Sequence, residues 1–167
     1  MTRENVVKDL MVSIFDYPHV PYWFSIGQAV QLIKMSVSGQ GDRLDPVVIL
    51  VFDEKYNLVG TAGRNELLKG LGPDSWNSES AIEEQSEAFP DMSEDFLAEA
   101  RERAERPVSE VMASVKYFVQ PDDSVTRAAF LMARHNLLML PVLEGKKKFV
   151  GLVRIADVFD DFASVTE

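Results

Sequence analysis

The sequence contains no cysteine among its 167 residues, which excludes disulfides, thiolate nucleophiles and cysteine-ligated metal sites. Histidine is almost as scarce. His19 and His135 are the two in the chain, and neither has a second ligand residue at a spacing typical of a metal site. We therefore interpret both histidines as structural residues and expect no metal.

Positive charge and long apolar runs are also in short supply. The 17 Lys and Arg residues face 27 Asp and Glu residues, and the net charge of −10 argues against nucleic acid or an anionic membrane as partner. The longest strongly apolar run, 47–52, is far too short to span a bilayer. The start of the chain lacks the apolar core of a signal peptide, so we expect a cytoplasmic protein.

Catalytic motifs are missing as well. The sequence has neither a P-loop nor a G-x-G-x-x-G pattern. The acidic pairs at 122–123 and 160–161 fall at a predicted helix start and on a predicted outer helix face, where carboxylates are usually solvated. No nucleophile, base and orienting group can be assembled, so we predict that the chain is not an enzyme.

The segment 149–159, FVGLVRIADVF, predicts a strand that runs directly into a helix. Arg154 falls at the joint and Asp157 on the first helical turn, where free N–H groups and the helix dipole favour anions. Such a joint can bind a phosphate. Taken alone, it is better explained by an Asp that complements the dipole and an Arg in solvent.

A second copy of this joint occurs at 58–68, LVGTAGRNELL. Alignment of Gly60 with Gly151 places Glu66 on Asp157. The similarity continues upstream, where two helical stripes and two short segments that end in methionine match in order, namely 25–33 with 124–132 and 7–11 with 108–112. Each copy therefore predicts a short helix, a loop, a helix, two strands and a helix.

Helix start signals support this interpretation. Ser25 and Gln28 form a capping box, and Asp122 or Asp123 is expected to cap the equivalent helix of the second copy. The first copy carries extra polar residues at 36–45, which we expect to form an exposed loop.

We divide the chain into a first repeat at 1–71, an acidic linker at 72–106 and a second repeat at 107–167. Within the linker, 93–106 predicts a helix with one apolar face. Ion pairs at i, i+4 are expected between Glu99 and Arg103 and between Glu102 and Arg106 (their spacing fits one helical face).

The two copies resemble the tandem CBS domain, named for cystathionine beta-synthase. The resemblance is carried by VSEVM, VQPDDSVTRAAFLM and LPVLEGKKKFVGLVRIADVF in the second copy, and by VKDLM through LVGTAGRNELL in the first. It implies an α/β fold of two βαββα repeats packed about a pseudo-twofold axis, with an inserted acidic helical linker. It also implies a regulatory module that binds an adenosine-containing nucleotide in the cleft between the repeats and signals to a protein partner. AMP, ADP, ATP or an S-adenosyl compound is the implied ligand, with no required cofactor, and the chain is expected to form a homodimer.

The resemblance also assigns residues. In the family motif a glycine is followed by two apolar residues, a Ser or Thr near the phosphate, two variable residues and an Asp on the ribose. Asp157 stands at the ribose position, and Arg154 stands where Ser or Thr is expected. The residues expected against the base are Ser114, Val115, Lys116, Met139 and Pro141, and those of a weaker second site are Gly63, Arg64 and Glu66.

An alternative interpretation stays open. The chain can instead be a protein-interaction or dimerisation module with degenerate, empty clefts, whose dimer surface or linker helix is the working part. Binding of adenine compounds distinguishes the two.

Overall fold

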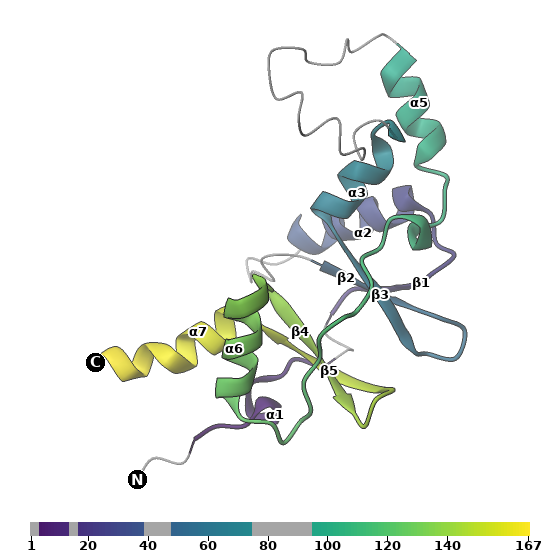
Figure 1. The fold of residues 1–167 in the computed structure, drawn as a ribbon. Coiled ribbons are helices and arrows are strands. Elements are labelled where there is room, and N and C mark those ends of the chain that lie inside the picture. Colours follow the sequence, from purple (N-terminus) through teal and green to yellow (C-terminus); the bar gives the residue numbers. More distant parts are fainter. Residues whose placement is uncertain (1–3, 14–16, 39–47, 75–94) are drawn as a thin grey trace. The chain divides into compact units, whose positions relative to one another are not determined.

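The structure, a computed structural model, describes residues 4–13, 17–38, 48–74 and 95–167 (Figure 1). The chain forms two compact units, and these differ from the sequence repeats. Unit 1 comprises 1–17, 54–58 and 115–167, and unit 2 comprises 18–53 and 59–114. Each unit therefore combines the amino-terminal segment of one repeat with the strands and helices of the other.

Unit 2 is a three-stranded sheet with helices packed on it. Its elements are β1 (His19–Pro21), α2 (Ile26–Ser38), β2 (Val48–Phe52), β3 (Leu58–Gly63), α3 (Arg64–Leu71), α5 (Asp95–Arg103) and the 3-10 turn η3 (Val108–Glu110). The strand order is β1-β2-β3, and β1 runs parallel to β2 with Val20 opposite Val51. Helices α2 and α3 lie beside each other over the sheet in Figure 1.

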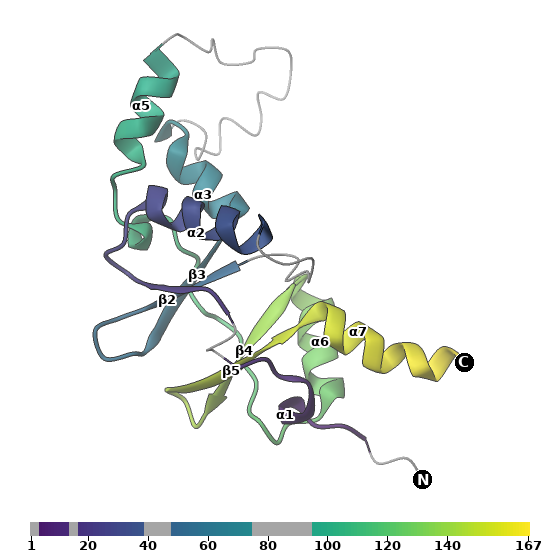
Figure 2. The ribbon, with the colours of Figure 1, turned by 180° about the vertical axis from the view of Figure 1, so that it is seen from behind.

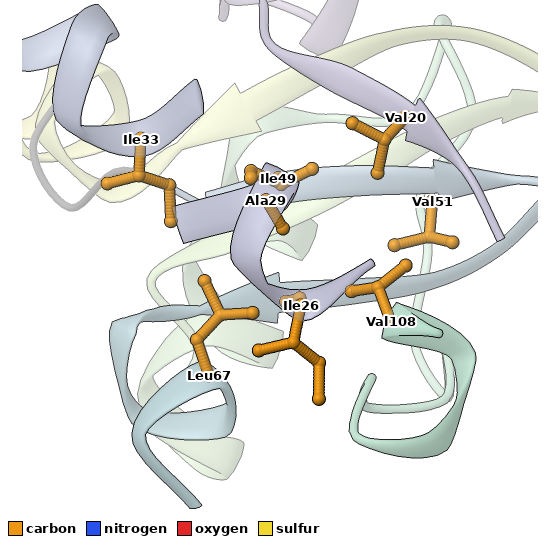
Figure 3. Close-up of a cluster of buried hydrophobic side chains, with 9 residues drawn as sticks. Val20, Ile26, Ala29, Ile33, Ile49, Val51, Leu67 and Val108 are labelled. Carbon is orange, nitrogen blue, oxygen red and sulfur yellow. The ribbon is translucent and has the colours of Figure 1, made fainter. Parts of the chain in front are cut away.

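The core of unit 2 lies between these helices and the sheet (Figure 3). The predicted apolar stripe of α2 supplies Ile26, Ala29 and Ile33, which are at most 5% exposed, while α3 adds Leu67. These side chains pack against the β-branched and small residues of the strands, as predicted for helices covering one face of a sheet. The predicted capping box starts α2: Gln28 N–H donates to Ser25 Oγ at 3.0 Å, and Ser25 N–H donates to Gln28 Oε1 at 2.9 Å.

Unit 1 repeats this plan with an antiparallel hairpin. Its elements are α1 (Val7–Leu10), α6 (Val125–His135), β4 (Met139–Glu144), β5 (Lys148–Arg154), α7 (Ile155–Ala163) and the 3-10 turn η4 (Ser164–Thr166). Figure 2 shows α6 and α7 beside β4 and β5, with α1 close to them. The core contains Val125, Ala128 and Met132 of α6, as the stripe predicted, and also Val7 from the amino-terminal segment.

One predicted helix cap is wrong. Ser124, rather than Asp122 or Asp123, caps α6, because its hydroxyl accepts the Arg127 N–H at 3.2 Å. Ser124 has extended backbone and directly precedes the first helical residue, which is the position an N-cap requires. Asp123 accepts the Gln120 N–H at 2.8 Å and so closes the preceding turn.

One helix lies within the predicted linker. Helix α5 covers Asp95–Arg103, and Glu99 lies 3.6 Å from Arg103 as expected. The expected pair of Glu102 with Arg106 is wrong, since the Arg106 guanidinium lies 3.8 Å from an Asp74 carboxylate oxygen instead. Positions 75–94 lie outside the described residues, as does most of the predicted loop 36–45, whose first residues belong to α2.

Two matching backbone bridges attach the amino-terminal segments to the strands. In unit 1, Val12 exchanges hydrogen bonds of 2.7 and 2.9 Å with Leu152 of β5. In unit 2, Ala113 exchanges hydrogen bonds of 2.7 and 2.9 Å with Thr61 of β3. These four residues occupy equivalent positions in the sequence alignment, so the predicted repeat is also a structural repeat.

Replacing the glycine beside either bridge by alanine is expected to destabilise the fold. A Cβ at Gly151 would lie 2.9 Å from the Val12 carbonyl oxygen, and one at Gly60 would lie 2.9 Å from that of Ala113. Relief requires a shift of bridge backbone, so we expect a loss of about 1 to 3 kcal/mol and a melting temperature lower by several degrees in a circular dichroism melt. Gly63→Ala is the control, because its new Cβ would meet nothing closer than 3.4 Å. An unchanged melting temperature for Gly151→Ala would contradict this account.

Candidate functional site

The joint between β5 and α7 contains no intervening loop. Strand β5 ends at Arg154, which has extended backbone (φ −102°, ψ 150°) and serves as the N-cap of α7, so the helix begins at the next residue. The Ile155 N–H donates to the Leu138 carbonyl at 2.9 Å and fixes the start of the helix against β4. The predicted passage from strand to helix is confirmed, and Asp157 lies on the first turn of α7.

Arg154 and Asp157 form a two-pronged ion pair across this joint. Arg154 Nε donates to Asp157 Oδ2 at 2.8 Å, and Nη2 donates to Oδ1 at 3.1 Å. The side chains are only 24% and 26% exposed, which limits competition from water. Paired charges in this planar arrangement form strong and directional hydrogen bonds. The sequence indicated two separate contacts for a ligand, whereas the structure joins the two side chains to each other.

Two further predicted site residues lie on the strand that pairs with this joint. Met139 is opposite Arg154 in the β4–β5 register, and Pro141 is opposite Leu152. Pro141 is buried, and its carbonyl accepts the Val119 N–H at 3.0 Å. The structure therefore places Arg154, Asp157 and Met139 at one end of the hairpin.

The segment expected to contact the base is divided between the units. Val115 and Lys116 belong to unit 1, where they lead into Val119 beside β4, while Ser114 is the last residue of unit 2. Lys116 is exposed and lines a depression of about 490 Å³ that is polar on most of its surface. The other residues of this depression are Tyr117, Phe118, Gln120, Asp123, Arg127 and Leu131.

The joint between β3 and α3 has the same backbone and a different charge pattern. Gly63 has extended backbone and is the N-cap of α3, and Arg64 begins the helix. A Cβ at Gly63 would lie 3.4 Å from Glu66 Oε2, so the Glu66 carboxylate turns back toward the joint. Within 4–13, 17–38, 48–74 and 95–167, no Lys, Arg or His forms an ion pair with Glu66. Arg64 is exposed and lines an apolar groove of about 430 Å³ between α2 and α3.

Both histidines contact aromatic rings. The His135 ring stacks on Tyr117 with centroids 3.9 Å apart, and the His19 ring meets the edge of Phe52 at 5.9 Å. In the described part of the chain, no three His, Asp or Glu side chains gather closely enough to hold a metal ion. None of the helices described is both long and apolar enough to pass through a bilayer.

Comparison with known proteins gives one matching family model and one shared fold. The CBS domain model matches residues 108–164, which include α6, β4, β5 and α7. A comparison with curated proteins found no match. Many solved structures share the fold, however, and several of them are CBS-domain pairs.

Three of these structures contain adenosine compounds. CBSX2 from Arabidopsis thaliana, in complex with AMP, is 17% identical with a TM-score of 0.66, over 97% of this chain and 98% of that one. The cytosolic domain of the Mg²⁺ channel MgtE, in complex with ATP, is 21% identical with a TM-score of 0.63, over 95% of this chain and 49% of that one. The CBS domain pair of protein MJ0100, in complex with 5′-methylthioadenosine and S-adenosyl-L-methionine, is 16% identical with a TM-score of 0.63, over 98% of this chain and 99% of that one. Similarity at these identities shows the fold.

Proposed function

We propose that this chain, a tandem CBS-domain protein, is a regulatory module that binds an adenosine-containing nucleotide and passes its occupancy on to a protein partner. The observation that carries the proposal is the β5–α7 joint, where a strand enters a helix without a loop and an acid lies on the first turn. The presence of AMP, ATP and S-adenosyl compounds in proteins of this fold supports adenosine as the common part of the ligand.

In this proposal Asp157 binds the ribose. An ionised carboxylate only accepts hydrogen bonds, so its two oxygens can take the protons of the two vicinal hydroxyls. The Ile155 N–H is used by the Leu138 carbonyl, but the next N–H groups of the first turn of α7 lack intrahelical partners and favour a phosphate nearby, which matters in a chain with a net charge of −10. Val115, Lys116 and Met139 would then contact the base.

The joint at Gly63 is the weaker site in this proposal. Glu66 is one methylene longer than Asp157, which places its carboxylate differently on the same helical turn, and Gly63 offers no side chain to the phosphate. Arg64 follows it at the start of α3.

The ligand is expected to raise the melting temperature. Added at one hundred times its dissociation constant, a ligand stabilises the fold by about 2.7 kcal/mol, and in a chain of this length that is a shift of several degrees. The panel to test by thermal shift is AMP, ADP, ATP, S-adenosylmethionine and 5′-methylthioadenosine. If none of them moves the transition, the interaction-module alternative takes the place of this proposal.

Asp157→Ala is expected to abolish the ligand-induced shift, whereas Glu66→Ala should reduce it less. Loss of the ion pair should itself cost about 1 to 3 kcal/mol, because both side chains are mostly buried and the Arg154 guanidinium is left without its partner. Asp160→Ala is the matched control, since it removes the same charge from an exposed position of α7. Calorimetric titration measures the affinity directly. Binding to Asp157→Ala as tight as to the wild type would show that the ribose contact is assigned to the wrong residue.

The exposed apolar faces of the helices support a homodimer. In unit 1, Phe130, Phe159 and Phe162 are 63%, 70% and 39% exposed on α6 and α7, and in unit 2 Leu68 of α3 is 61% exposed. Large aromatic side chains exposed on two helices that pack together, such as α6 and α7, are typical of an interface. We propose that these helices meet the same helices of a second copy across a twofold axis.

Light scattering checks this assembly. We expect a mass of twice 18.8 kDa at micromolar concentration, and Phe159→Glu should return the monomer because it places a charge in the interface. Leu97→Glu tests whether α5 takes part, since Leu97 is 67% exposed on that helix. A wild-type mass of 18.8 kDa would rule out the dimer.

A further inference from the structure

We infer that the Arg154–Asp157 ion pair makes this site select adenosine ligands that carry a 5′-phosphate. The ribose engages Asp157 more favourably when the ligand also supplies an anion for Arg154. This inference rests on the proposed contact between Asp157 and the ribose. It separates AMP, ADP and ATP from adenosine, 5′-methylthioadenosine and S-adenosylmethionine.

The first step is competition for one carboxylate. Both oxygens of Asp157 already accept a guanidinium N–H, at 2.8 and 3.1 Å. Two vicinal hydroxyls need the same two oxygens in nearly the same plane. The ribose therefore has to displace the guanidinium, or accept poorer hydrogen-bond geometry.

The second step is the fate of the displaced guanidinium. Arg154 is 24% exposed, so water replaces only part of its lost ion pair. Across the residues that the structure describes, Asp157 is the one carboxylate paired with Arg154. A phosphate matches the guanidinium fork and restores two charged hydrogen bonds. A thioether or a hydroxyl cannot do so, and a sulfonium would bring a second positive charge close to the first.

The third step is the place where the guanidinium changes its partner from Asp157 to the phosphate, which is the start of α7. Arg154 is the N-cap of α7, which is a helix of nine residues. The N–H groups in the first turn of such a helix have no intrahelical partners. A phosphate held there meets both the guanidinium and the helix N-terminus. The joint at Gly63 has no side chain in this position, so it does not select for phosphate in the same way.

The test compares AMP with adenosine by calorimetric titration. All proteins carry Glu66→Ala, so that the β5–α7 joint alone is titrated. We expect AMP to bind at least about tenfold more tightly than adenosine, which corresponds to one charged hydrogen-bonding pair. Arg154→Thr should reduce that ratio severalfold, and it should raise the affinity for adenosine because Asp157 loses its competitor.

The controls separate selection from stability. Threonine is a favourable N-cap residue, so Arg154→Thr is expected to fold. If it does not fold, Arg154→Gln is the second variant, because it removes the charge and nearly keeps the length of the side chain. Arg134→Thr removes an exposed arginine from the last turn of α6 in the same unit, away from the proposed contacts, and it should leave the ratio unchanged. The gain in adenosine affinity is the signature that a merely structural arginine would not give.

Three results would overturn the inference. If Arg154→Thr lowers both affinities equally, or if adenosine and AMP bind the Arg154 protein with equal affinity, phosphate selection is wrong while the proposed function stands. If neither compound binds with Glu66→Ala and Arg154 both present, yet the wild type binds AMP, the site lies at the other joint. Failure of every adenosine compound to bind the wild type removes the proposed function and this inference together.

Discussion

Val12 can reach β5 because Gly151 has no side chain, and the geometry of unit 1 depends on that close approach. The bridge between Val12 and Leu152 adds backbone hydrogen bonds to a hairpin of only two strands, and it brings Val7 into the core. A two-stranded hairpin is barely stable by itself in water. The strand that ends at Arg154 is thus held from both sides, by β4 and by the amino-terminal segment. In unit 2, Gly60 likewise allows Ala113 to approach β3 closely.

The same backbone at the two joints carries different chemistry. At one joint an arginine N-cap neutralises the acid of the first turn, and at the other a glycine N-cap leaves the acid without a paired cation among the described residues. The two repeats therefore present joints with similar backbone and unequal electrostatics. In an acidic chain, such local differences decide which joint attracts an anion.

Local periodicity and repetition were sufficient to predict two strands between two helices in each copy, the buried stripes of α2 and α6, and the strand-to-helix joints, but they missed β1, which lies in the segment predicted as a loop. The cap of α6 was predicted wrongly because three polar residues in a row all favour an N-cap, and backbone conformation decides among them. The Arg154–Asp157 pair was missed because side-chain rotamers at a helix start do not follow from spacing. The exchange of amino-terminal segments was not predicted either. The sequence alignment of the two repeats is the same whether each amino-terminal segment packs on its own repeat or on the other one. Long-range pairing of this kind depends on the whole chain.

The exchanged segments make the two halves of the chain mutually dependent. A piece cut to the matched range 108–164 lacks the segment around Val7 and Val12 that completes its core and its sheet. The other half in turn lacks Val108, which fills the core of unit 2. Removal of either half of the chain therefore takes away core residues that the other half uses. Packing thus gives both repeats a structural role, even if one of the joints has no ligand of its own.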